Sequence, residues 1–196
     1  MQMGFEAYLD LLYNHQGLFW ELMEKNQAFA IEYANAQLEA GATAIGYFDP
    51  LSSPTIIGRE KFIETGFPIM KQTLAALKGP GVVHFASGRC LQILDKVMET
   101  PAVGVGVSSL EDLTALKEKC RGRLTLLGNL DGISMRRWTT AEADRQVRTA
   151  VMKAGQGGGF ILADNHGEIP YQVTDEVLHA IQRGVVRWGQ YPLKGA

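Results

Sequence analysis

Five short apolar runs alternate with longer stretches of helical spacing, and this order is the strongest constraint on the fold. Each run is almost continuously hydrophobic, as expected for parallel strands covered on both faces. The expected strands are Ala44–Phe48, Val82–Phe85, Ala102–Val107, Leu124–Leu127 and Phe160–Ala163. Helical spacing predicts helices over residues 59–78, 88–98, 110–121, 139–154 and 174–188. Alternation of this kind indicates βαβ units, a parallel sheet and the α/β class.

No linker divides the chain, so residues 1–196 are expected to form a single domain, in which residues 1–40 are a helical lead-in. Thr139 and Thr174 have the sequence context of helix N-caps. The glycine-rich stretch 155–159 precedes a strand, whereas a phosphate-binding loop follows a strand and opens a helix. We therefore expect a helix C-cap and a tight turn at these glycines.

Charge and cysteine content exclude several classes of protein. Nineteen basic residues against twenty-one acidic ones give no electrostatic reason to expect nucleic acid or an anionic membrane as a partner. Two cysteines cannot build a disulfide framework, and no apolar run reaches membrane-spanning length. The first lysine is Lys25, so the start of the sequence lacks the basic region of a signal peptide. A cytoplasmic globular protein is expected.

Polar residues recur where the predicted strands end. Because the carboxyl ends of parallel strands share one rim, where βα loops build active sites, these residues are expected to line a pocket. They are Asp49, His84, Ser108, Ser109, Asn129, Asp131, Asp164, Asn165 and His166. Their number does not distinguish an open sheet from a barrel.

Several of these residues also have a purely structural interpretation. Ser108 or Ser109 is better explained as the N-cap of the next helix than as a nucleophile. Asp49 precedes a proline and is suited to shaping a turn. Asn129 and Asp131 are suited to satisfying loop backbone groups. For these residues both interpretations remain open.

The histidines differ in how readily a structural role explains them. His84 ends an apolar run and is explained equally well as a hydrogen-bonded core residue. His166 is flanked by Asp164 and Glu168, so we assign it a functional role. His15 and His179 lie in helical stretches and are expected to be surface or packing residues.

An ordered set of segments resembles the uroporphyrinogen decarboxylase superfamily, in particular its branch of cobamide-dependent methyltransferases. That branch transfers methyl groups from corrinoid proteins to coenzyme M. The resemblance extends over essentially the whole chain, in family order. The segments are residues 40–42, Phe48–Pro54, Gly128–Asp131, Gly159–Leu162, Asn165–Pro170 and Tyr191–Pro192.

The resemblance implies a TIM barrel of which this chain matches the carboxy-terminal half. Five strands cannot close an eight-stranded barrel, and the exposed edges of a half-barrel invite pairing with another chain. The chain is therefore expected to form a homo-oligomer or to bind a complementing chain, unless it is part of a longer protein.

The methyltransferase branch implies a zinc ion that activates a thiol acceptor, held by a His-x-Cys and by a cysteine in the last βα loop. His84 matches the first ligand, Ala86 stands at the first cysteine and His166 at the second. His84 and His166 are therefore the candidate metal ligands, with Cys90 a distant substitute for the missing thiol.

The decarboxylase branch implies no metal and a histidine in the last loop, which His166 and Gly167 match. An imidazole there is placed to donate a hydrogen bond or a proton to a substrate. The arginines that grip tetrapyrrole carboxylates in that branch belong to its early strands, which have no counterpart here.

Three functions therefore stay open. The leading one is methyl transfer between a corrinoid protein and a thiol or similar acceptor. The second is carboxy-lyase activity on a tetrapyrrole, and the third is a non-catalytic half-barrel that binds corrinoid or a partner protein. The candidate catalytic residues are His166, Asp49 and His84, and the candidate substrate-binding residues are Asn129, Asp131 and Asp164.

Overall fold

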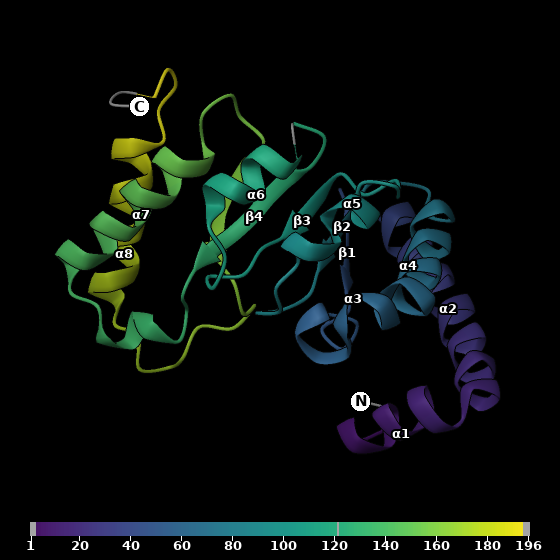
Figure 1. Ribbon diagram of the computed structural model, residues 1–196. Helices are drawn as coiled ribbons and strands as arrows, with labels where there is room; N and C mark the ends of the chain where they lie inside the picture. Colours follow the sequence, from purple (N-terminus) through teal and green to yellow (C-terminus); the bar gives the residue numbers. More distant parts are fainter. Residues whose placement is uncertain (1–2, 121, 194–196) are drawn as a thin grey trace.

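The computed structural model describes residues 3–120 and 122–193, and its centre is a parallel sheet of five strands (Figure 1). The strands lie in the order of the chain, with every neighbouring pair parallel. They are β1 (Ile45–Phe48), β2 (Gly81–His84), β3 (Gly104–Gly106), β4 (Thr125–Leu130) and β5 (Phe160–Asp164). The predicted α/β class and all five strands are confirmed, with ends that differ by at most three residues.

The helical lead-in consists of two helices, α1 (Phe5–Asn14) and α2 (Gln16–Glu39), separated at His15. Between β1 and β2, the single helix predicted over residues 59–78 is wrong, because the structure has α3 (Pro54–Glu64) and α4 (Gly66–Ala75). Ser53 begins α3 by accepting a hydrogen bond from the Thr55 amide. Thr65 leaves the helical region with φ −125°, so α3 and α4 are two helices.

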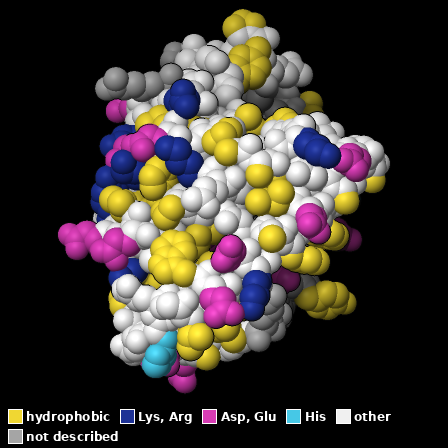
Figure 2. Space-filling model, turned by 90° about the vertical axis from the view of Figure 1, so that its right-hand side faces the viewer, with side chains coloured by type: hydrophobic (Ala, Val, Ile, Leu, Met, Phe, Trp, Pro, Cys, Tyr) yellow, Lys and Arg dark blue, Asp and Glu magenta, His cyan; other side chains and the backbone are white. Residues whose placement is uncertain are grey.

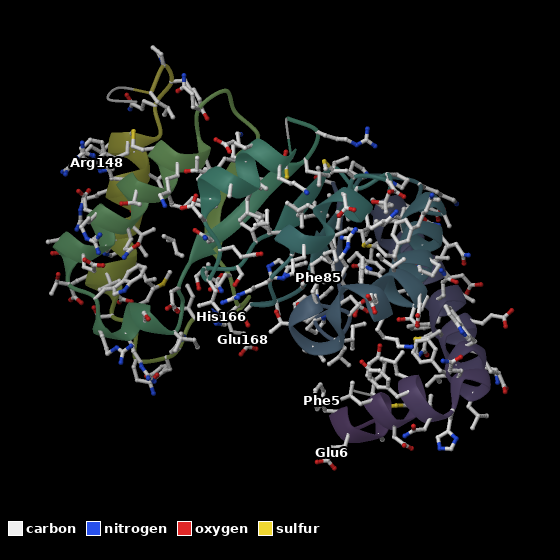
Figure 3. The ribbon with its side chains drawn as sticks, viewed as in Figure 1. Phe5, Glu6, Phe85, Arg148, His166 and Glu168 are labelled. Atoms are coloured by element: carbon white, nitrogen blue, oxygen red, sulfur yellow. The ribbon has the colours of Figure 1, made fainter. Side chains whose placement is uncertain are left out.

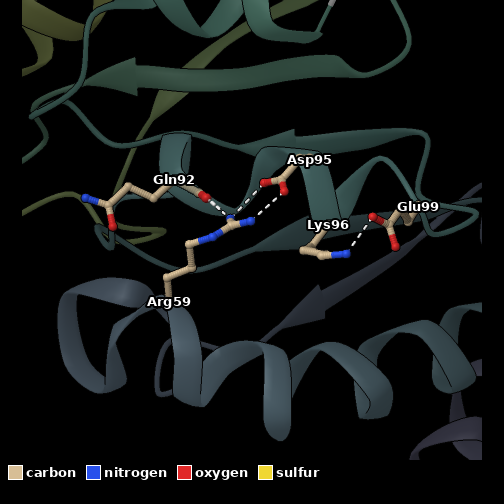
Figure 4. A network of polar contacts seen from close by, with 5 residues as sticks. All are labelled: Arg59, Gln92, Asp95, Lys96 and Glu99. Carbon is tan, nitrogen blue, oxygen red and sulfur yellow. Dashed lines mark hydrogen bonds and ion pairs between the residues drawn. The ribbon is translucent and has the colours of Figure 1, made fainter.

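The predicted helix over residues 88–98 is reduced to the 3₁₀ turn η1 (Leu91–Ile93) and the short helix α5 (Leu94–Val97). Arg59 of α3 holds this segment. Its guanidinium donates to both carboxylate oxygens of Asp95, at 2.8 and 2.6 Å, and to the Gln92 carbonyl (Figure 4). Lys96 pairs with Glu99 at 2.7 Å on the same segment. Tertiary contacts, more than helical propensity, therefore fix the β2–β3 connection.

The later connections follow the prediction more closely. They are α6 (Leu113–Cys120), the 3₁₀ turn η2 (Ser134–Arg137), α7 (Thr140–Ala154) and α8 (Asp175–Trp188). Thr139 caps α7 by accepting from the Glu142 amide at 3.2 Å. The predicted serine cap of α6 is wrong, because Asp112 accepts the Thr114 and Ala115 amides instead. Thr174 makes no side-chain cap bond at α8. Gly157, with φ 76°, supplies the positive φ that the predicted turn after α7 requires.

The outer face of the sheet carries the main core. Val83, Val105 and Leu126 project from β2, β3 and β4 toward the covering helices, and each has no exposed surface. Leu12 of α1 and Phe19 of α2 join the same cluster, so the helical lead-in packs on it. A smaller cluster joins Leu130 to α7 and α8. The helices of Figure 1 therefore bury one side of the sheet.

The inner face of the sheet is much more open. Phe48 at the end of β1 is 61% exposed, and Ile161 of β5 is 54% exposed. In the middle of this face β3 contributes only glycine, because Gly104 and Gly106 lie beside the side chains of Val82 and His84. In a closed barrel this face would be the interior. None of the described helices is both long and apolar enough to cross a lipid bilayer.

Candidate functional site

His84 stands on the inner face, at the carboxyl end of β2. Its ring stacks on Phe48 with centroids 5.7 Å apart and lies over Gly106, where an added Cβ would come within 2.2 Å of the ring. The Ala86 amide donates to His84 Nδ1 at 3.0 Å, from a residue held in the left-handed region with φ 52°. Because Nδ1 accepts, neutral His84 carries its proton on Nε2.

Burial lowers the pKa of His84, and the charge of Asp164 offsets part of that effect. Loss of hydration disfavours the imidazolium, whereas a nearby carboxylate favours it. The net result is a neutral imidazole at neutral pH. His84 is therefore a hydrogen-bond donor through Nε2, and its electrostatic partner Asp164 comes from β5, three strands away along the sheet.

Asp164 is the last residue of β5, and His166 lies in the loop that follows it (Figure 3). One carboxylate oxygen of Asp164 accepts the amides of His166 and Gly167, each at 2.8 Å. This turn fixes the backbone of the loop immediately after the strand. Gly167, with φ 85°, allows the chain to reverse there.

Asn165 orients the ring of His166. The amide is 1% exposed and lies between Ser109, Leu130 and His166. In the orientation that satisfies all its neighbours, it donates to His166 Nδ1 at 2.7 Å and to the Leu130 carbonyl at 2.9 Å. Its oxygen then accepts from the Ser109 amide and hydroxyl at 3.2 and 3.1 Å. Neutral His166 therefore also carries its proton on Nε2.

Asp131, at the end of β4, lies close enough to His166 for their charges to interact. Burial acts to raise the pKa of Asp131, but hydrogen bonds from Ser134 and the charge of His166 outweigh it, so the pKa is lowered. The Ser134 hydroxyl and amide donate to the carboxylate at 2.6 and 3.1 Å. Asp131 is thus a carboxylate held in a turn, and both Ser134 and the charge of His166 stabilise its charged form.

Asn129 is a connector between loops. Its amide donates to the carbonyls of Ser108 and Glu111 at 2.9 and 3.2 Å. Asn129 and Asp131 line a polar hollow of about 470 Å³ between β4, α6 and α7, whose other charged residues include Glu111 and Lys153. The structural interpretation thus accounts for the Asn129 amide, while the hollow leaves room for a small polar ligand.

Asp49 lies apart from the histidines. The residues of β1 alternate, and Tyr47 and Asp49 turn toward α1 and α2, away from His84 on the inner face. The Ser52 amide donates to Asp49 at 3.2 Å, and Tyr47 Oη is 3.5 Å from the carboxylate. Burial raises the pKa of Asp49, with the hydrogen bonds from Ser52 and Tyr47 opposing it. Asp49 shapes the turn after β1, next to Tyr8 of α1, whose pKa burial raises to about 12.

The rim thus places His84 within the electrostatic reach of Asp164, and Asp131 within that of His166, and leaves Asp49 in a separate, mostly apolar environment. Asn165 is the residue that sequence reasoning noted without giving it a role. Its signal was present, since a polar residue directly after a buried strand and before a candidate histidine is well placed to orient that histidine.

The predicted zinc site does not fit these residues. A metal-binding histidine normally donates its second ring N–H to a neighbouring acceptor, which leaves the other nitrogen free for the metal. Here Nδ1 of both His84 and His166 accepts, so Nε2 holds a proton. Across the described residues, no three His, Cys, Asp or Glu side chains gather closely enough to hold a metal ion. Cys90, fully buried and hydrogen-bonded toward the Gly106 carbonyl, does not replace the missing thiol.

Relatives with curated names match most of this chain. It is 29% identical over 189 residues to a uroporphyrinogen decarboxylase of Cellvibrio japonicus, covering 92% of this chain and 51% of that protein. It is 28% identical over 182 residues to one of Cupriavidus necator, covering 88% and 49%. The chain spans about half the length of these relatives.

Two solved structures share the fold. A methyltransferase from Methanosarcina mazei superposes with a TM-score of 0.82 at 19% identity, covering 94% of this chain and 54% of that one. A B12-independent methionine synthase from Shewanella superposes with a TM-score of 0.61 at 16% identity, covering 89% and 56%. The five parallel strands are therefore a large part of a TIM-barrel-type fold. The family model described as uroporphyrinogen decarboxylase (URO-D) matches residues 1–187, and the chain belongs to that family.

Proposed function

We propose that this chain carries the catalytic rim of a URO-D family methyltransferase, which moves a methyl group between a corrinoid protein and a thiol or similar acceptor. The observation that carries the proposal is the pair of histidines, His84 and His166, each held with Nδ1 as acceptor and Nε2–H as the remaining donor. The fold similarity to the Methanosarcina methyltransferase supports the same assignment.

The two Nε2–H groups suit the electrostatic demand of methyl transfer. A thiol becomes nucleophilic as its thiolate, and hydrogen-bond donors held in advance stabilise such an anion. In this proposal the two imidazoles supply the stabilisation that the thiolate needs. Asn165 and the Ala86 amide are then positioning groups, because they act on the substrate only through the histidine rings.

The step balances without an added oxidant or reductant. The acceptor's sulfur–hydrogen bond breaks and its proton passes to water. The thiolate sulfur then forms a bond to the methyl carbon while the cobalt–carbon bond of the methylcorrinoid breaks. The bonding electron pair stays on cobalt, which leaves cob(I)alamin. Among the carboxylates, Asp164 interacts electrostatically with His84 and Asp131 with His166.

The second candidate, tetrapyrrole decarboxylation, draws on the names of the sequence relatives and on His166. The groups around the histidines oppose it. They are the carboxylates Asp131 and Asp164 and the amide Asn165, and none of these is a cation that would pair with the several carboxylates of a tetrapyrrole. Decarboxylation would therefore need cationic groups from outside this cluster.

The direct test supplies methylcobalamin and 2-mercaptoethanol to the chain and follows cob(I)alamin formation by absorbance under anaerobic conditions. The same assay is run with the remaining part of the Methanosarcina methyltransferase added as a separate polypeptide. We expect turnover in at least the second arm, and a loss of about 100-fold or more in His166→Gln, in line with removal of a preorganised donor.

His179→Gln is the matched control, because it makes the same change on α8 at a position outside the rim. The control should retain the wild-type rate. Absence of turnover in both arms would overturn the methyl-transfer proposal. Binding of uroporphyrinogen at micromolar protein, abolished by His166→Gln, would favour the decarboxylase instead.

A further inference from the structure

Ser108 and Ser109 lie in the loop between β3 and α6, residues 107–112, and the proposed function gives neither of them a role. Charged side chains lie at the surface, as Figure 2 shows for one face of the molecule, so a buried hydroxyl group calls for its own explanation. Ser108 has no exposed surface and Ser109 is half-buried. Since Asp112 caps α6, helix capping does not account for either hydroxyl.

The Ser108 hydroxyl faces the loop after β2. It donates to the Ser87 carbonyl at 2.8 Å and accepts from the Leu110 amide at 3.2 Å. Ser87 directly follows Ala86, whose amide donates to His84 Nδ1. Ala86 is held at φ 52°, a region that a residue with a Cβ adopts only when its surroundings keep it there. The bond from Ser108 therefore helps to keep the Ala86 amide on the imidazole.

Ser109 faces the other histidine. Its amide and hydroxyl donate to the side-chain oxygen of Asn165 at 3.2 and 3.1 Å. With that oxygen held, the Asn165 nitrogen is left to donate to His166 Nδ1 at 2.7 Å. A side-chain amide can turn over and exchange its oxygen and nitrogen, so donors on one side decide which atom meets the ring. Ser109 therefore acts on the proton position of His166.

The loop that carries the two serines is anchored by other groups as well. The Asn129 amide donates to the carbonyls of Ser108 and Glu111 at 2.9 and 3.2 Å. The Glu111 carboxylate accepts the amides of Cys90 and Leu91 at 2.8 to 3.1 Å. None of these bonds uses a serine hydroxyl. Removing one hydroxyl should therefore change what the loop holds without releasing the loop itself.

We propose that this loop, through its two consecutive serines, fixes both histidines of the rim as Nε2–H donors. Ser108 acts on His84 through the loop after β2. Ser109 acts on His166 through Asn165. Both serines are positioning residues, since each acts through other groups. The inference deepens the proposed function and rests on it only for the use of the two donors in methyl transfer.

The test is nitrogen-15 NMR of the imidazole rings in Ser108→Ala and Ser109→Ala, with urea unfolding to show that each variant is folded. In Ser109→Ala we expect the ratio of Nδ1–H to Nε2–H in His166 to rise about fivefold, the effect of one ordinary hydrogen bond. The His84 signals should stay as in the wild type. Ser108→Ala should do the converse, so each variant is the matched control of the other.

Conservative replacements separate the hydroxyl from the space that it fills. Ser109→Thr keeps the hydroxyl and should retain the wild-type signals of His166. Ser108→Cys fills nearly the same buried space with a weaker donor, so its effect on His84 should have the same direction and be smaller. His15 and His179, which lie outside the rim, are internal references in every spectrum.

A purely structural role predicts a different result. Alanine variants that lower the free energy of unfolding and leave both rings unchanged would overturn the proposal. So would a Ser109→Ala effect that falls on His84 instead of His166. Methyl-transfer rates are measured on the same samples. Rings that respond as expected in a protein without turnover would support this inference and overturn the proposed function alone.

Discussion

The rim around His166 and the edge at β1 lie at opposite ends of the same sheet and differ in how fully their groups are satisfied. At the rim, Asn165 is buried and hydrogen-bonded on all sides, and Asp164 accepts two backbone amides. At the edge, Gly46 and Phe48 present backbone groups to an open groove. The rim is complete within this chain, whereas the edge is not.

This difference shows that the side chains of the rim can be fully hydrogen-bonded in a chain whose sheet still has an open edge. A βα loop draws its hydrogen-bond partners from neighbouring strand ends, so β4 and β5 with their loops are enough to orient His166. A closed barrel wall draws on every strand. The four predictions below set one side of this comparison against the other, in order of decreasing effect.

Replacing Phe85 by Ala should cost about 3–5 kcal/mol of unfolding free energy. Phe85 is 1% exposed, belongs to the main core and meets Phe62 edge-on at 6.1 Å. The matched change Phe48→Ala, on the open inner face, should stay within about 0.5 kcal/mol in the isolated chain. Urea unfolding of both variants checks this. Equal losses would mean that the inner face is already buried in solution.

Asn165→Ala should cost about 1–3 kcal/mol, because it leaves the Ser109 amide and hydroxyl without their acceptor, while the Leu130 carbonyl keeps the backbone amide of residue 165. It should also free the tautomer of His166. Nitrogen-15 NMR of the imidazole is expected to show protonated Nε2 in the wild type and a mixture in the variant. A wild-type ring protonated on Nδ1 would contradict the described orientation of the site.

Asp49→Asn should raise stability at pH 7 by about 1 kcal/mol, since it removes a buried carboxylate while keeping an acceptor for the Ser52 amide. The folded pKa of Asp49 is raised above its ordinary value of 3.8. The contribution of Asp49 to the free energy of unfolding is therefore fully present below pH 3.8 and is lost as the pH rises through the pKa of the folded state. Thermal unfolding should show wild type and variant diverging over that window. A variant less stable than the wild type at pH 7 would contradict this, because it would show that the charged carboxylate of Asp49 stabilises the fold.

The Arg59–Asp95 pair should contribute the least, about 0.5–1 kcal/mol in a double-mutant cycle of Arg59→Gln and Asp95→Asn. The side chains are 37% and 39% exposed, so solvent screens the pair despite its two-point geometry. A coupling energy that vanishes in 1 M salt would agree with this account. A coupling above about 2 kcal/mol would show that solvent screens the pair less than its exposure indicates.

The sequence predicts the sheet well because each strand is a local apolar run, and its pattern does not depend on what lies far away in the chain. The helices over residues 59–78 and 88–98 were wrong because ends set by Ser53, Thr65 and the Arg59 contacts override helical spacing. His84, Asp131, Asp164 and His166 lie at or just after the carboxyl ends of β2, β4 and β5, and their functional roles remain a prediction. Asp49 stands apart, because alternation along β1 turns it to the other face.

The residue types alone did not show whether His84 and His166 could bind zinc. The resemblance pointed to His84 and His166 as ligands, but the proton position depends on Ala86 and Asn165, whose hydrogen bonds exist only in the fold. The apolar groove between α2 and β1 was equally hidden, since it depends on where α2 packs. The expected need for a partner chain came from counting strands, and it remains a prediction.

Hydrogen exchange of single amides tests the central claim most directly, because it compares the β1 edge with the interior of the sheet in one sample. In the isolated chain at low concentration, the amides of Gly46 and Phe48 should exchange at least 100-fold faster than those of Leu126 and Leu127 in β4. Equal protection of all four amides without a partner would contradict the account.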